Sequence, residues 1–207
     1  MLARQTDTHF EECSMDVSRN VIIIGAAEGS LSGLRQLLSA LPASLPAAVL
    51  VVLHAPLETL QLDLMLDKTG FLPTVYAKET QTLQEGHIHL AAPDSEMVAR
   101  PCGSLGIEPI PLGLERHRMI DRLLQSAADV WGFRVVAVIL SGCGGAGTQG
   151  LRAVEHAHGI AIVQDPEEAV VPEMPRHAIE HDNPHHVVPI SGIIELLMAL
   201  TQKEHVV

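Results

Sequence analysis

The chain has 207 residues, of which 47% are hydrophobic and only 2% aromatic, and its formal net charge at pH 7 is −12. This length supports one domain with a sizeable core. The negative charge repels nucleic acid and anionic membranes, so neither is an expected partner. An aliphatic, β-branched interior is typical of a parallel sheet covered by helices.

A change in composition near residue 19 predicts the domain boundary. Residues 1–19 are polar and aperiodic, which predicts a flexible lead-in followed by a single domain over residues 20–207. The lead-in has no apolar run typical of a signal peptide, and no later run reaches the roughly 18 residues of a spanning helix. Three cysteines without CxxC pairing, Cys13, Cys102 and Cys143, are typical of free thiols in a reducing cytoplasm.

The first half of the chain alternates strands and helices. Residues 21–24 predict a buried strand that runs into a turn at Gly25–Ser30, and the leucines of residues 31–41 recur at helical spacing. A second buried strand ends at His54 and is stopped by Pro56. A helix is expected around residues 60–71, and a short strand over residues 74–79.

The second half of the chain does not begin with the strand–helix alternation of the first half. Residues 86–112 alternate in short runs punctuated by Gly and Pro, which indicates hairpin-like excursions instead of another βαβ unit. A helix with Ile120 and Leu124 on one side follows, then an apolar strand, a glycine-rich turn over residues 141–147 and another helix. A strand at 160–165, a helix, a strand and a last helix capped by Ser191 complete the chain. The predicted fold is α/β: a doubly wound, mainly parallel sheet with helices on both faces and a small hairpin excursion.

Three turns follow predicted parallel strands: residues 25–30, His54, and residues 141–147. Because the carboxyl ends of parallel strands meet at one edge of a sheet, we expect the three turns to share a cleft. Their sequences are GAAEGS, VLVVLHAP and VILSGCGGAG, accompanied by EGHIHLAAPD, RHRMID and VQDPEEAVVPEMPRHAI.

With these motifs the chain resembles the catalytic domain of the chemotaxis protein-glutamate methylesterase family, CheB, from residue 21 to about residue 200. The family's motifs read G-A-S-T-G-G, a strand ending in Q-H, and V-I-L-T-G-M-G-x-D-G. The resemblance implies hydrolysis of glutamate methyl esters on chemoreceptors by a serine, a histidine and an aspartate. It also implies a site loop that here comprises Gly25, Glu28, Gly29, Gly142 and Gly144.

Two of the three implied catalytic positions have changed. Ala27 stands at the nucleophile and Ala146 at the acid, while His54 is retained. A methyl group neither attacks a carbonyl nor orients an imidazole, and loss of the nucleophile lowers turnover by about 10⁶. The leading hypothesis is therefore an inactive methylesterase-like domain that acts as a binding or scaffolding module.

Two displaced nucleophiles provide an alternative from another class, an active carboxyl esterase that uses His54. Cys143 is one, since a thiol near a histidine and helix amides ionises, although a buried structural thiol is the simpler interpretation. Ser30 is the other, although a small polar residue in the first helical turn explains it as well. Glu28 either fills the site as a built-in anion at a helix start or points to solvent, and His54 is itself either a retained base or a structural residue.

The remaining polar clusters predict no cofactor and no metal site. His87 and His89 share a strand face, and three histidines surround Asp182, namely His181, His185 and His186, but nothing links the two groups. The acidic pair Glu167 and Glu168 is interpreted as a solvated loop beside a turn at Asp165.

The family resemblance also bears on partners and regulation. It implies a chemoreceptor or another signalling protein as partner, and the sequence does not determine an oligomeric state. The family's amino-terminal receiver domain has no counterpart in the roughly twenty residues before the first strand, so control is expected to come from a partner or from expression.

Overall fold

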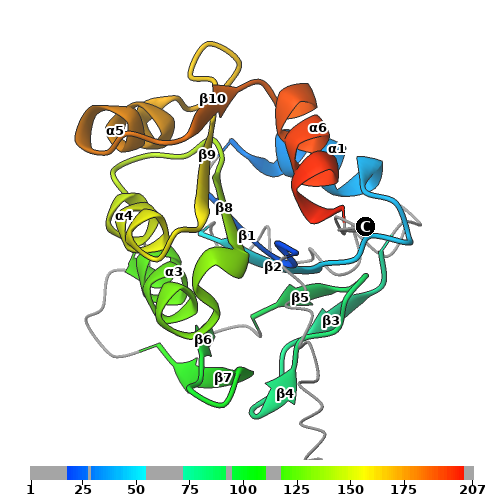
Figure 1. Ribbon diagram of the computed structural model, residues 1–207. Coiled ribbons are helices and arrows are strands. Elements are labelled where there is room, and N and C mark those ends of the chain that lie inside the picture. The colour runs from blue at the N-terminus through cyan, green and yellow to red at the C-terminus, as the bar shows by residue number, and fades with distance from the viewer. Residues whose placement is uncertain (1–17, 28, 55–71, 92–94, 111–117, 203–207) are drawn as a thin grey trace, which may run out of the picture.

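A seven-stranded sheet forms the centre of the computed structural model (Figure 1), which describes residues 18–27, 29–54, 72–91, 95–110 and 118–202. The strands are ordered β10-β9-β8-β1-β2-β5-β3, and each pair of neighbours is parallel. Their bounds are β1 Val21–Ala26, β2 Ala48–Leu53, β3 Thr74–Tyr76, β5 Ile88–Leu90, β8 Val135–Ile139, β9 Ile160–Gln164 and β10 His186–Val188. The predicted doubly wound, mainly parallel sheet is confirmed.

Helices cover both faces of this sheet (Figure 1). On one face lie α3 (Arg118–Trp131), α4 (Thr148–His156) and α5 (Glu173–His181), and on the other α1 (Leu31–Ala40) and α6 (Ile190–Thr201). The strand β1 is buried on both sides: Val21 and Ile23 pack in the core with α3, whereas Ile22 and Ile24 pack in the core with α1 and α6. Continuous apolar runs therefore form the central strands, as burial on two faces requires.

The segment from residue 86 to 109 contributes to two sheets, which corrects the expectation of hairpins alone. The strand β5 lies in the parallel sheet between β2 and β3. Only β6 (Ser95–Ala99) and β7 (Ser104–Pro109) form an antiparallel hairpin, to which β4 (Gln81–Thr82) adds a third strand. Three residues are too few to carry a periodic signal, so the parallel pairing of β5 was not visible in the sequence.

The expected helix around residues 60–71 lies outside the described residues. The last helix, α6, begins after Pro189 and has no side-chain cap from that residue, and Ser191 lies within the helix. The predicted cap at Ser191 is therefore wrong. A short 3₁₀ helix at Gly132–Arg134 leads into β8.

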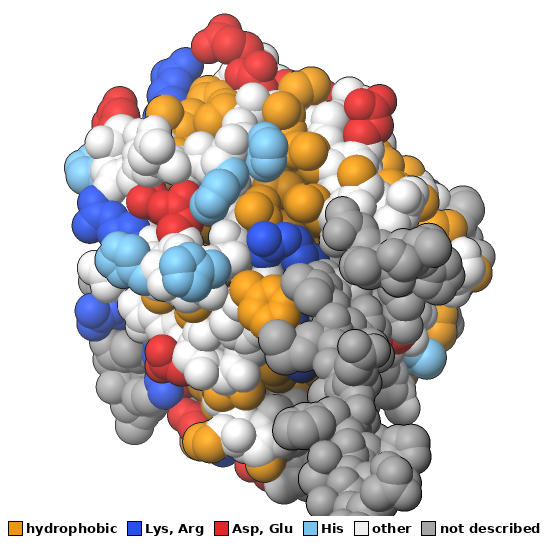
Figure 2. Space-filling model, in the orientation of Figure 1, with side chains coloured by type: hydrophobic (Ala, Val, Ile, Leu, Met, Phe, Trp, Pro, Cys, Tyr) orange, Lys and Arg blue, Asp and Glu red, His pale blue; other side chains and the backbone are white. Residues whose placement is uncertain are grey.

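The surface over α4 and α5 carries histidines and charged side chains of both signs, beside a strip of apolar side chains (Figure 2). Exposed large apolar residues include Val170 and Val187, which flank α5 in the sequence. Among the described residues, no helix is both long and apolar enough to cross a membrane.

Candidate active site

The three predicted turns meet at the carboxyl edge of the sheet. The strand β1 pairs with β2 and with β8, and Ala26 lies opposite Leu53 while Gly25 lies opposite Ile139. Backbone hydrogen bonds continue beyond the strands: His54 N donates to Ala26 O over 2.8 Å, and Ala27 N donates to Ser141 O over 3.1 Å. Positions 27 and 54 and the glycine-rich turn are thus neighbours.

Ala27 is a core residue, with 2% of its surface exposed. A Cβ built on Gly142 would lie 2.6 Å from Ala27 Cβ and 3.0 Å from Met174 Cε. The methyl group of Ala27 therefore occupies a tight apolar contact between the turn after β8 and the start of α5.

Ala146 belongs to the same apolar cluster as Ala27 and is 1% exposed. Its turn depends on glycine, because Gly144 and Gly147 have φ values of +74° and +86°. His54 is half-buried at the end of β2. The structure thus brings an imidazole to the same sheet edge as two apolar methyl positions.

The side chain of Ser30 forms a hydrogen bond with a structural role. Its side chain is buried, and Oγ donates to Ala27 O over 2.5 Å while Ser30 N donates to the same oxygen over 3.1 Å. The hydroxyl closes the turn between β1 and α1, in agreement with the structural interpretation of this residue.

Ser141 connects the glycine-rich turn to the loop after β9. Val171 N donates to its Oγ over 2.9 Å, and Ser141 N donates to Gln164 Oε1 over the same distance. Gly142 N donates to Val171 O, and Met174 N donates back to Gly142 O. Sequence reasoning missed this loop as a wall of the site, although a polar Gln164 at the end of an apolar strand was a signal.

Cys143 is an exposed free thiol, and the alternative of a buried structural thiol is therefore wrong. The glycines of the turn allow the chain to leave the core at this point. Among the other site-loop residues, Gly29 has a φ of +79° and Gly25 lies in β1 against Ile120, while Glu28 lies outside the described residues. Cys102 is also a free, exposed thiol, and its Sγ lies 2.9 Å from Ser104 Oγ.

The histidines are held by structural contacts. His89 is fully buried in β5, where Gln84 N donates to its Nε2 over 3.3 Å and burial lowers its pKa. Ala161 N donates to His185 Nδ1 over 3.2 Å. Within the ranges that the structure describes, no three His, Cys, Asp or Glu side chains are arranged to hold a metal ion.

The two glutamates in the loop after β9 are both exposed. Asp165 Oδ1 accepts a hydrogen bond from Glu167 N, which forms the expected turn. Glu168 Oε2, in contrast, accepts a bond of 2.6 Å from Ile190 N at the start of α6. Both acids are thus exposed as predicted, and Glu168 in addition caps a helix distant in sequence.

The comparisons with known proteins identify the family. The protein-family model described as CheB methylesterase matches residues 22–197 of this chain. This chain belongs to the CheB methylesterase family. In the structures compared, the Thermotoga maritima CheB methylesterase catalytic domain superposes with a TM-score of 0.79 at 29% identity, covering 87% of this chain and 98% of that one.

Curated relatives of the CheB family lead to the same assignment. Protein-glutamate methylesterase/protein-glutamine glutaminase 1 of Myxococcus xanthus is 32% identical over 88% of this chain and 54% of its own length. Protein-glutamate methylesterase/protein-glutamine glutaminase of Symbiobacterium thermophilum is 30% identical over 86% of this chain and 50% of its own length. This chain spans about half the length of these relatives, whereas it covers 94% of a putative Leptospira interrogans relative at 26% identity.

Proposed function

We propose that this CheB-family domain has lost ester hydrolysis and acts as a binding or scaffolding module for a signalling protein of the chemoreceptor class in the cytoplasm. The observation that carries the proposal is the burial of Ala27 and Ala146 in one apolar cluster. Neither methyl group supplies an oxygen for His54 to deprotonate or to be oriented by.

The hydrogen bond of Ser30 argues against Ser30 as the nucleophile that takes the place of Ala27. An attacking hydroxyl must face the substrate and give its proton to the base. Ser30 Oγ is buried and donates to Ala27 O, so its lone pairs and proton serve the turn. This favours the inactive module over an esterase based on Ser30.

Cys143 supports a second candidate function, an esterase with a displaced thiol nucleophile and His54 as base. Its exposure is the observation in favour, because a substrate carbonyl can reach the thiol. The absence of an acid at position 146 counts against it, since no carboxylate from that position fixes the imidazole.

The test compares methanol release from a methylated chemoreceptor by three proteins: the wild type, Ala27→Ser/Ala146→Asp, and that double variant with His54→Ala. We expect the wild type to match the buffer blank, and the double variant to regain hydrolysis that His54→Ala removes. Binding of the intact methylated receptor by the wild type, measured by titration calorimetry, is expected to occur without turnover.

Two outcomes would overturn the proposal. One is hydrolysis by the wild type that Cys143→Ala abolishes, together with a covalent adduct of an ester-mimicking electrophile on Cys143. The other is the absence of receptor binding by a folded wild-type protein. Failure of the double variant even after Glu28→Thr would mean that the cleft itself has changed.

A further inference from the structure

A cavity of about 440 Å³ lies on the face of the sheet that carries α3, α4 and α5. Its walls come from all three helices and from the glycine-rich turn, through Arg118, Asp121, Gly145, Thr148, Arg152 and His177, with Gln149 and His181 completing the lining. This size fits a small organic molecule, since typical ligand cavities hold about 300–1,000 Å³.

Two arginines, Arg118 and Arg152, supply the cationic groups of the cavity. Arg152 is oriented by its own contacts: Nη2 donates to His181 O, and Nε lies 3.9 Å from Asp182 Oδ1. Arg118 begins α3 and makes no ion pair with another described residue. Asp121 is the acid in the lining, and its Oδ1 accepts a hydrogen bond of 2.8 Å from Gly150 N.

The imidazoles of His177 and His181 form a fixed wall of the cavity. Their rings stack with centroids 4.1 Å apart and an angle of 14° between the planes. His177 Nδ1 lies 2.9 Å from Thr148 Oγ1, and His181 Nδ1 donates to His177 O over 3.0 Å. A Cβ on Gly145 would lie 2.6 Å from His177 Cε1, so the ring lies directly on the backbone of the turn.

We propose that this cavity binds a small organic oxyanion, a molecule that carries a phosphate or carboxylate group. Guanidinium groups bind both kinds of oxyanion through paired hydrogen bonds. The inference does not depend on the function proposed above, because none of the cavity residues stands at the positions of the family's catalytic triad.

The overall charge favours a small ligand over an acidic protein. A large acidic surface would face the repulsion of a chain with net charge −12, whereas a small anion enters within about 10 Å of the two arginines, the distance over which charges act at 0.1 M salt.

Titration calorimetry with inorganic phosphate, glycerol 3-phosphate and citrate tests the proposal, with glycerol and sodium chloride at matched ionic strength as controls. At least one oxyanion is expected to bind more tightly than chloride. Phosphate and glycerol 3-phosphate without citrate would identify a phosphate ligand, and citrate alone a carboxylate.

Three variants decide whether the cavity is the site. Arg118→Gln is expected to weaken binding about tenfold, since a charge-assisted pair is lost. Asp121→Asn is expected to strengthen binding several-fold, since it removes the acid of the cavity and keeps an acceptor for Gly150 N. Arg35→Gln is the matched control on α1, which covers the opposite face, and is expected to leave affinity unchanged.

The proposal is wrong if the three oxyanions bind no better than chloride, or if Arg118→Gln and Arg35→Gln bind them equally. It is also wrong if a glutamate-rich peptide binds and the small anions do not. Circular dichroism checks that each variant is folded, and Arg152→Gln is left out because Arg152 also bonds to the backbone of α5.

Discussion

At position 27, for which the motif resemblance implies a nucleophile, a methyl group packs in the core. Its contact with Gly142 leaves no room for a further carbon atom, as a Cβ there would lie 2.6 Å from Ala27 Cβ. The glycine at 142 is thus required by packing, whereas Gly144 in the same turn has no heavy atom within 4 Å of a built Cβ and is required by its φ of +74°.

This difference predicts the effects of two alanine substitutions. Gly142→Ala is expected to lower the free energy of unfolding by about 1–3 kcal/mol through overpacking. Gly144→Ala is expected to lower it by about 1–2 kcal/mol, because its strain is limited to the left-handed backbone. Urea denaturation measures both.

A double variant separates packing from backbone effects at Gly142. Adding Ala27→Gly to Gly142→Ala removes the closest clash, so the loss for the pair should be smaller than the sum of the two single losses. Simple additivity of the two changes would contradict the packing explanation.

At the scale of elements, the start of α6 depends on a residue in another loop. Glu168 Oε2 accepts from Ile190 N, whereas Pro189 at the cap position forms no side-chain cap. A carboxylate at a helix start both satisfies an amide and complements the helix dipole. The side chains of Ile190, Ile193 and Leu197 then anchor α6 in the core.

Removal of this carboxylate is expected to destabilise the protein. Glu168→Ala should lower the free energy of unfolding by about 1 kcal/mol, the usual effect of losing a cap. Glu167→Ala is the matched control: its carboxylate is exposed and lies 3.6 Å from Arg176, so a change within about 0.5 kcal/mol is expected. Equal losses in thermal or urea unfolding would argue against capping by Glu168.

Glu155 near the end of α4 interacts with Asp182, which directly follows α5. Burial raises the pKa of Glu155 to about 7, and the adjacent charge and hydrogen bond of Asp182 contribute. His185 Nδ1 lies 3.3 Å from Glu155 Oε1 but accepts a hydrogen bond from Ala161 N, so it carries no proton for an ion pair. Burial also lowers the pKa of His185.

The raised pKa of Glu155 predicts a dependence of stability on pH. The folded protein holds this proton between the ordinary pKa of 4.5 and about 7, whereas the unfolded chain has lost it. The contribution of Glu155 to stability is therefore full below pH 4.5, falls as the pH rises to about 7, and is then lost.

Glu155→Gln tests this dependence, since its amide remains neutral and donates a hydrogen bond to Asp182. The midpoint of urea unfolding is expected to be higher for Glu155→Gln than for the wild type at pH 8, with the gap closing towards pH 5. A gap that stays constant between pH 5 and pH 8 would contradict the raised pKa of Glu155.

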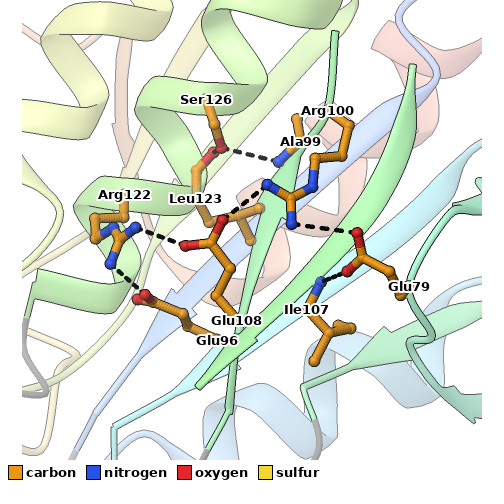
Figure 3. A network of polar contacts seen from close by, with 9 residues as sticks. All are labelled: Glu79, Glu96, Ala99, Arg100, Ile107, Glu108, Arg122, Leu123 and Ser126. Carbon is orange, nitrogen blue, oxygen red and sulfur yellow. Dashed lines mark hydrogen bonds and ion pairs between the residues drawn. The ribbon is translucent and has the colours of Figure 1, made fainter. Parts of the chain in front are cut away.

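At the scale of the whole molecule, a chain of ion pairs joins the small antiparallel sheet to α3 (Figure 3). Arg122 of α3 binds Glu96 on β6 and, over 2.9 Å, Glu108 on β7. Arg100 continues from Glu108 over 2.8 Å to Glu79 over 3.2 Å. Glu96 is only 1% exposed, and burial raises its pKa despite the nearby arginine.

Removal of the Arg122 charge alone is predicted to lower the free energy of unfolding more than removal of both charges of the Arg122–Glu96 pair. Arg122→Gln leaves the buried Glu96 without its counter-charge and should lower the free energy of unfolding by about 1–3 kcal/mol, reduced from the value for a fully buried pair because Arg122 is 35% exposed.

Adding Glu96→Gln should restore part of the loss caused by Arg122→Gln, because the neutral pair no longer buries a charge. Hydrogen exchange in β6 and β7 should show the same order as global unfolding. If the double variant were less stable than Arg122→Gln, the buried charge would not be the reason for the loss.

Patterns local in the chain were sufficient to predict most elements of the fold. The buried strands β1, β2, β8 and β9 are apolar runs, and the helices α1, α3 and α4 carry apolar residues at helical spacing, so the doubly wound sheet was predicted. The CheB family was predicted separately, from the resemblance of the motifs in the turns. Short-range hydrophobic periodicity reports which residues are buried, and burial on two faces is what defines such a sheet.

The tertiary structure decided the features that depend on contacts between distant segments. The insertion of β5 between β2 and β3, the cap of α6 by Glu168 and the bond of Ser141 to Val171 each join residues at least 14 positions apart. The same applies to the burial of Ala27 against Gly142 and to the exposure of Cys143. Such contacts follow from the packing of whole elements, for which local sequence patterns carry no signal.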